Sequence, residues 1–130
     1  MQKSSTVALI SDNKLLLLKR GETAPWMPNK YCLPGGGVDK NESLIKAGAR
    51  ELYEETGIEL ELDQLIPFTI YYPKYSKVIF VCNEDVSYSV KLNWEHSDYL
   101  WVSHKESSLV DLVPGLRVTI KTLGDSGYLI

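Results

Sequence analysis

The sequence is poor in cysteine and in long apolar runs. Its two cysteines, Cys32 and Cys82, lie far apart and match no metal-binding spacing, so a disulfide scaffold and a zinc site are both disfavoured. Its apolar runs are short, as at residues 7–10 and 15–18. A membrane span needs about 20 apolar residues and a secretory signal about 7–15. We therefore expect a cytoplasmic protein that does not enter a membrane, with both cysteines as small apolar core residues.

The sequence also lacks an excess of basic charge. It carries 14 Lys and Arg against 17 Asp and Glu, for a formal net charge of −3. Proteins that hold nucleic acid by bulk electrostatics usually present a basic face, so that class is disfavoured. The 130 residues, 44% of them hydrophobic, fit one domain, residues 1–130, with its own core. Small-molecule enzymes, binding modules and metal sites remain open.

Short apolar runs between turn residues predict several strands. They are expected at residues 6–10, 15–19, 65–72, 77–83 and 99–103. Turn residues at 11–14 and 73–76 predict hairpins between the first two strands and between the next two. The irregular segment 21–38 is long for a compact domain, and loops of that length are usually functional.

Two segments have the spacing of helices. Residues 41–56 lie between a favourable N-cap, Asn41, and a stop residue, Gly57. Four of their residues recur at helical spacing and should face the core: Ile45, Ala49, Leu52 and Thr56. A last helix is expected to begin at Pro114 and to bury Leu116, Ile120 and Leu123, although residues 118–120 also suit a strand. This order of elements indicates an α+β fold with a mixed sheet covered by helices.

Three glutamates crowd one face of the first predicted helix. Glu51, Glu54 and Glu55 stand at i, i+3 and i+4, on a face that points away from the core stripe. Their mutual repulsion, and the negative end of the helix dipole nearby, both destabilise the helix. A hard divalent cation such as Mg²⁺ removes this conflict, because it prefers oxygen ligands. The alternative is a solvated acidic face, the usual meaning of clustered glutamates.

These glutamates belong to a longer pattern of fixed spacing. A glycine is followed after five residues by Glu, and after seven more by Arg-Glu, an apolar residue, any residue, Glu-Glu, any residue, Gly and an apolar residue. The fixed positions here are Gly36, Glu42, Arg50, Glu51, Leu52, Glu54, Glu55, Gly57 and Ile58. Residues 36–58 therefore resemble the box of the Nudix hydrolase family, and the resemblance extends more loosely to residues 15–20, 33–36 and 101–102.

The resemblance implies a fold and a reaction. The Nudix fold is a mixed β-sheet sandwiched between α-helices. Its enzymes hydrolyse a nucleoside diphosphate linked to another moiety, by attack of water on phosphorus with Mg²⁺, for which Mn²⁺ can substitute. Carried over to this chain, Glu51, Glu54 and Glu55 would be metal ligands, and Glu54 is favoured as the base. Arg50 would act with Glu42, which pairs with it, to fix the helix and orient the glutamates.

Residues around these positions receive further expected roles by the same resemblance. The Gly35 carbonyl would be another metal ligand, Gly36 would allow a sharp turn beside the substrate, and Gly57 would be structural. Glu95, with Asp98 as the alternative, would be the acid that family members often supply from outside the box. The two histidines, His96 and His104, receive no role and are expected at the surface.

The substrate is less defined than the reaction. Arg20 and Lys19, helped by Lys30, are expected near the phosphates. Trp26 could stack on a nucleobase or anchor its loop on the core. The expected partner is a small nucleotide, and the family resemblance allows a homodimer. Two other functions stay open: a nucleotide-sensing module of Nudix fold that does not cleave its ligand, and hydrolysis at an RNA 5′ end.

Overall fold

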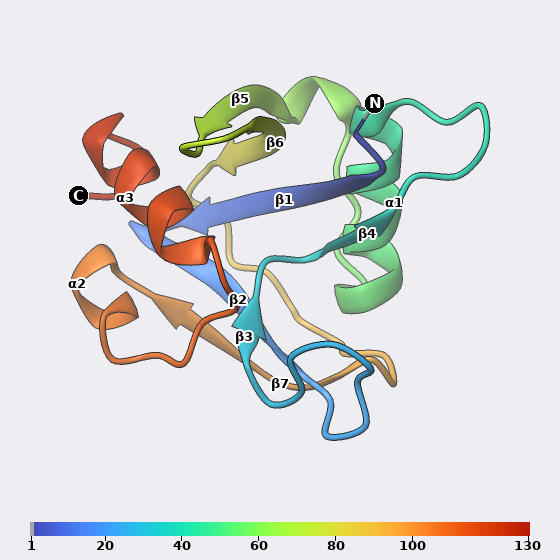
Figure 1. The fold of residues 1–130 in the computed structure, drawn as a ribbon, viewed down its shortest axis with the longest axis horizontal. Helices are drawn as coiled ribbons and strands as arrows, with labels where there is room; N and C mark the ends of the chain where they lie inside the picture. Colours follow the sequence, from blue (N-terminus) through green and yellow to red (C-terminus); the bar gives the residue numbers. More distant parts are fainter. Residues whose placement is uncertain (1) are drawn as a thin grey trace.

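A mixed sheet forms the centre of the fold (Figure 1). The computed structural model describes residues 2–130. The strands are β1 (Ser4–Ser11), β2 (Lys14–Arg20), β3 (Tyr31–Cys32), β4 (Gly35–Gly37), β5 (Ile66–Tyr71), β6 (Ser76–Asn83) and β7 (His96–Val102). The main path runs β3-β2-β1-β6-β5, while β4 also pairs with β1 and β7 with β2. Only the β1–β6 pair is parallel among the strand pairs of residues 2–130.

Helices cover both faces of this sheet, as Figure 1 shows. They are α1 (Leu44–Thr56), α2 (His104–Ser107) and α3 (Leu116–Asp125), with a 3₁₀ turn, η1 (Leu62–Gln64). Along β1, Val7 and Leu9 pack in the same cluster as Leu52 of α1, whereas Ala8 and Ile10 share a cluster with α3. The apolar runs 7–10 and 15–18 are unbroken because both faces of these strands are buried. Within residues 2–130, no helix combines the length and apolar character needed to cross a bilayer.

Most of the predicted strands and helices are confirmed. Both cysteines are buried and free, as predicted. Asp12 and Asn13 take φ values of 50° and 57°, as a tight hairpin turn between β1 and β2 requires. The predicted turn at residues 73–76 is present one residue earlier, since residues 72–75 join β5 and β6. The stripe of apolar residues on α1 faces the core as predicted.

The predicted start of α1 at Asn41 is wrong. Asn41 has a φ of 64°, in the left-handed region, and the helix begins three residues later. Its N-cap is Ser43, whose side chain accepts a hydrogen bond from the Lys46 N–H at 3.3 Å. The predicted end is confirmed: Gly57 has a φ of 74° and its N–H donates to the Tyr53 carbonyl at 2.8 Å.

The predicted start of α3 at Pro114 is also wrong. Gly115 follows Pro114 with a φ of 86°, which no residue inside a right-handed helix adopts. The helix therefore begins at Leu116, with Gly115 as its N-cap. Its buried face is as predicted, and residues 118–120 are helical rather than a strand.

We predict that Ser43→Ala lowers the free energy of unfolding by about 1 kcal/mol, because the α1 N-cap loses its acceptor. Asn41→Gly is the matched control and should cost nothing, since glycine adopts a positive φ freely. Urea denaturation measures both changes. A larger cost for Asn41→Gly than for Ser43→Ala would contradict this assignment of the helix start.

Candidate active site

Helix α1 meets β4 at Gly36, a position where no side chain fits. A Cβ added at Gly36 would lie 2.5 Å from the Glu51 carboxyl carbon. The Glu51 carboxylate therefore rests directly against the backbone of β4, and its side chain is only 13% exposed. Burial raises the pKa of Glu51, an effect that the nearby charge of Arg50 opposes. Gly36 is required here because of this close approach.

Glu55 is more deeply buried than the sequence pattern indicated. The prediction that all three glutamates point away from the core is wrong for Glu55, which is 1% exposed. Its Oε1 accepts a hydrogen bond from the Gly35 N–H at 2.9 Å. Burial raises the pKa of Glu55 to about 8, against the lowering effect of that bond, and the charges of neighbouring glutamates raise it further. Glu55 thus binds its proton in the neutral pH range.

Arg50 connects the glutamates to the loop before α1. Its Nε and Nη2 donate to the two carboxylate oxygens of Glu42 at 2.8 and 3.0 Å, so the expected pairing is present. Its Nη1 donates to Glu51 at 3.1 Å and to Glu54 at 2.9 Å. The Arg50 bond, with a further one from the Asp39 N–H, holds the pKa of Glu42 at about 2. The hydrogen bonds to Glu42 and Glu54 raise the pKa of Arg50 above its ordinary value.

The donor set suits a hard divalent cation. The carboxylates of Glu55 and Glu51 lie against Gly35 and Gly36, and Mg²⁺ prefers such oxygen ligands. Across residues 2–130, no three His, Cys, Asp or Glu side chains already form a metal-binding group. In this arrangement Arg50 Nη1 bonds Glu51 and Glu54, while Glu55 bonds the Gly35 amide. The Arg50 guanidinium therefore balances the negative charge of the Glu51 and Glu54 carboxylates.

Glu95 lies near enough to Glu51 and Glu55 to change their pKa values. The charge of Glu95 raises the pKa of both Glu51 and Glu55. Asp98 raises the pKa of Tyr31 instead. Glu95 is partly buried, and its backbone carbonyl accepts from the Gly21 N–H at 3.0 Å, which anchors it beside the loop that follows β2. This charge effect makes Glu95 a stronger candidate than Asp98 for the acid from outside the box.

The prediction that both histidines lie at the surface is wrong for His96. This residue is 7% exposed, and its Nε2 lies 3.7 Å from the Cys32 sulfur. Burial lowers the pKa of His96, so the ring is neutral at neutral pH. His104 is exposed, as expected.

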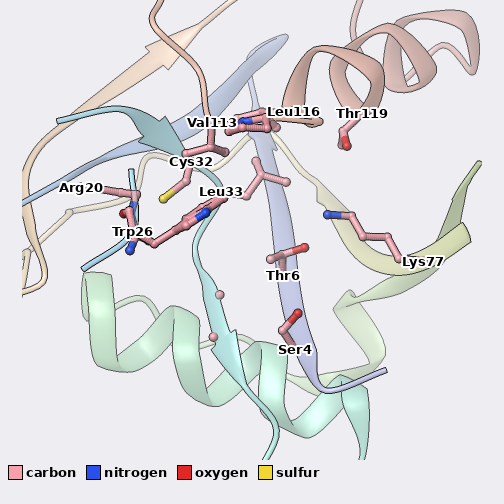
Figure 2. A pocket seen from close by; sticks show the side chains of 13 residues that line it. Ser4, Thr6, Arg20, Trp26, Cys32, Leu33, Lys77, Val113, Leu116 and Thr119 are labelled. Atoms are coloured by element: carbon pink, nitrogen blue, oxygen red, sulfur yellow. The ribbon is translucent and has the colours of Figure 1, made fainter. Parts of the chain in front are cut away.

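A pocket of about 270 Å³ opens on the α3 side of the sheet (Figure 2). Its walls come from five strands and from the segment that enters α3. They are formed by Ser4, Thr6, Arg20, Trp26, Cys32, Leu33, Gly35, Gly36, Lys77, Val113, Pro114, Leu116 and Thr119. Because Gly35 and Gly36 have no side chains, this pocket reaches the backbone against which Glu51 rests.

Two of the predicted substrate residues line this pocket side by side (Figure 2). The Arg20 guanidinium lies 5.2 Å from the Trp26 ring centroid, and its Nε donates to the Trp26 carbonyl at 2.6 Å. Trp26 is 49% exposed, which does not fit a residue that anchors its loop in the core. Lys19 is absent from the described walls, and Lys30 pairs with Asp111 at 2.8 Å.

Sequence reasoning missed the polar residues on the far side of the pocket. Ser4 and Thr6 alternate with buried residues along β1 and continue the row of Ala8 and Ile10. The two-residue period of a strand, extended back from Ala8 and Ile10, is the signal that could have placed them on this face. Lys77 and Thr119 come from β6 and α3 and have no local pattern that marks them.

Comparisons with known proteins agree with this geometry. The family model described as the NUDIX domain matches residues 1–123. This chain belongs to the Nudix family. It is 30% identical to the nucleoside triphosphatase NudI of Escherichia coli O139:H28, over 88% of this chain and 90% of that protein. The predicted family, the α+β Nudix fold and the class of hydrolases acting on phosphoric anhydrides are confirmed.

Solved structures show the same Nudix fold. The MutT protein of Methanosarcina mazei Go1 is 28% identical, with a TM-score of 0.74 over 95% of this chain and 92% of that one. An Ap4A hydrolase of C. elegans is 20% identical, with a TM-score of 0.75 over 95% of this chain and 97% of that one. At that identity the second similarity concerns the fold alone.

We predict that Glu55→Gln changes the pH dependence of stability in the metal-free protein. Between the ordinary pKa of 4.5 and the folded value of about 8, the folded state holds a proton that the unfolded state has lost. The Glu55 contribution therefore falls as pH rises through this window, by up to about 1.4 kcal/mol per pH unit. Glu55→Gln should remove that slope.

Urea denaturation in EDTA, at several pH values across the window, measures the difference between wild type and variant. The exposed Glu59 supplies the control, Glu59→Gln, which should keep the wild-type slope. Equal slopes for wild type and Glu55→Gln would show that the raised pKa is wrong.

Proposed function

We propose that this chain, as one domain, is a Mg²⁺-dependent pyrophosphohydrolase of small nucleotides. One observation carries the proposal: Gly36 lies both in the wall of the pocket and against the Glu51 carboxylate. A nucleoside in the pocket would thus have its phosphates beside the carboxylates. The carboxylate cluster and the pocket lie on different faces of the sheet and meet at the glycines of β4.

Five groups would hold the cation: the carboxylates of Glu51, Glu54, Glu55 and Glu95 and the carbonyl of Gly35. When bound, Mg²⁺ (or Mn²⁺ in its place) would stabilise the charge that develops on the transferred phosphoryl group. Glu55 would give up its proton to join the cluster. Arg50 would release Glu51 and Glu54 without losing its place, because its Nε and Nη2 bonds to Glu42 do not involve Nη1.

Glu54 is our candidate for the general base. Its side chain is 47% exposed, the most accessible of the three box glutamates, so water reaches it freely. The attacking water would pass a proton to the Glu54 carboxylate as its oxygen bonds to phosphorus. The phosphoanhydride P–O bond then breaks, and the leaving phosphate takes the electron pair. Arg50 and Glu42 act as positioning residues that fix α1 against the loop before it.

The pocket would take the nucleoside end of the substrate. Arg20 and Trp26 supply a cation and an aromatic face at one side, which suits the phosphate and sugar end of the substrate and leaves the opposite side to the base. Lys19, outside the described walls, is given no role in this proposal. The name of the relative NudI favours a nucleoside triphosphate as substrate.

We predict that Glu54→Gln lowers kcat by about 100-fold or more with Mg²⁺, because the neutral amide neither takes the proton nor attracts the cation. Its stability should change little, since the side chain is half exposed. Phosphate or pyrophosphate release from a panel of nucleoside triphosphates measures the effect. Glu59→Gln should keep wild-type activity.

A flat result for the wild-type protein across triphosphates, nucleotide sugars and dinucleoside polyphosphates would contradict the proposal. Thermal stabilisation by a nucleotide without turnover would instead favour a sensing module. Release of phosphate or pyrophosphate only from the 5′ end of RNA would favour an RNA 5′-end pyrophosphohydrolase.

We further predict that removal of the cation weakens nucleotide binding. Without Mg²⁺ the carboxylates beside Gly36 repel phosphates, and Arg50 offsets only part of their charge. The affinity of the wild-type protein for a non-hydrolysable nucleoside triphosphate analogue, measured by calorimetry, should fall at least about tenfold in EDTA. An affinity that EDTA leaves unchanged would mean that protein cations alone hold the phosphates.

A further inference from the structure

The pocket contains a cation that no acid balances. Lys77 of β6 extends its ammonium group into the pocket from the side opposite Arg20 and Trp26 (Figure 2). No wall residue is acidic, and Lys77 takes part in no salt bridge or side-chain hydrogen bond with the rest of residues 2–130. It lies 5.7 Å from the Tyr72 ring centroid. Its three N–H donors are therefore available to a ligand.

The strand order places this ammonium far from the phosphate side. β4 and β6 flank β1 on its two sides, since Thr6 pairs with Gly35 and Val7 pairs with Phe80. Gly36 and Lys77 are thus separated by two strand spacings, about 10 Å. The hydroxyls of Ser4 and Thr6 lie on the floor between them. A nucleoside with its phosphates at Gly36 would extend its base across β1 towards Lys77.

We propose that Lys77 is a specificity-determining residue that selects bases with a keto oxygen on the edge farthest from the sugar. The inference rests on the proposed function of the pocket. An ammonium group only donates hydrogen bonds, so it pairs with O4 of uracil or thymine and with O6 of guanine or hypoxanthine. It opposes the amino groups that cytosine and adenine carry at the same positions, because two donors then face each other.

The other polar group at this end of the pocket does not discriminate. The Thr119 hydroxyl lies 2.9 Å from the Tyr72 hydroxyl, and either atom can be the donor. Such a pair adapts to a keto or to an amino group by rotating its hydrogens. The choice between the two groups therefore falls to Lys77.

Two matched pairs of substrates, UTP with CTP and ITP with ATP, test the proposal in the wild-type protein and in Lys77→Met. The members of each pair differ in the keto or amino group at this edge and in the adjoining ring nitrogen. Wild-type kcat/KM should favour the keto member by about tenfold or more, the value of one hydrogen bond to a charged donor. In Lys77→Met both ratios should fall to near one, through a higher KM for UTP and ITP. Lys77→Arg should restore part of the preference.

The matched control is Lys105→Met, which removes an exposed lysine of α2 and should leave both ratios unchanged. No preference in the wild type, a preference that survives in Lys77→Met, or an equal loss for all four substrates would each overturn the proposal. Calorimetric binding of UMP against CMP, and of IMP against AMP, gives a readout that needs no turnover. A binding preference that Lys77→Met abolishes, in a protein without hydrolysis, would uphold this inference and reject the proposed function.

Discussion

The site depends on the bonds of one guanidinium. Arg50 holds Glu42 of the preceding loop, the Gly37 carbonyl of β4 and two glutamates of its own helix. Without this cation, the carboxylates near the end of α1 would repel each other against the helix dipole. Because the same side chain reaches the loop, the strand and the helix, it also fixes their relative positions. Charge balance and geometry are therefore provided by a single residue.

How much could be predicted from sequence follows from how local each interaction is. The stop at Gly57 was predictable from local helix signals, and the Arg50–Glu42 pair from the family resemblance, because both lie within one segment. The start of α1 was missed because Asn41 adopts a left-handed conformation that its residue type permits but does not dictate. The buried His96 lies beside Cys32 because β3 and β7, far apart in the sequence, both pair with β2.

The pocket illustrates the same limit on a larger scale. Its walls combine β1, β3, β6 and the entry to α3, segments that only the completed sheet brings together. Lys77 is an ordinary strand lysine until β6 pairs with β1. The Nudix box predicted the reaction class because its residues act as a unit within one helix and one loop. The residues proposed to contact the base are scattered through the chain, so no comparable motif reveals them.

The absence of a side chain at Gly36 has an evolutionary consequence. The carboxylates lie on the α1 face and the pocket on the α3 face, and they meet only at this thin stretch of backbone. Changes in α3 or β6 can alter the shape and polarity of the pocket without disturbing the packing of α1, since distant sites usually vary independently. A lineage can thus acquire new substrates while its hydrolytic chemistry stays fixed, and the permanent requirement is that position 36 keeps a single hydrogen for a side chain.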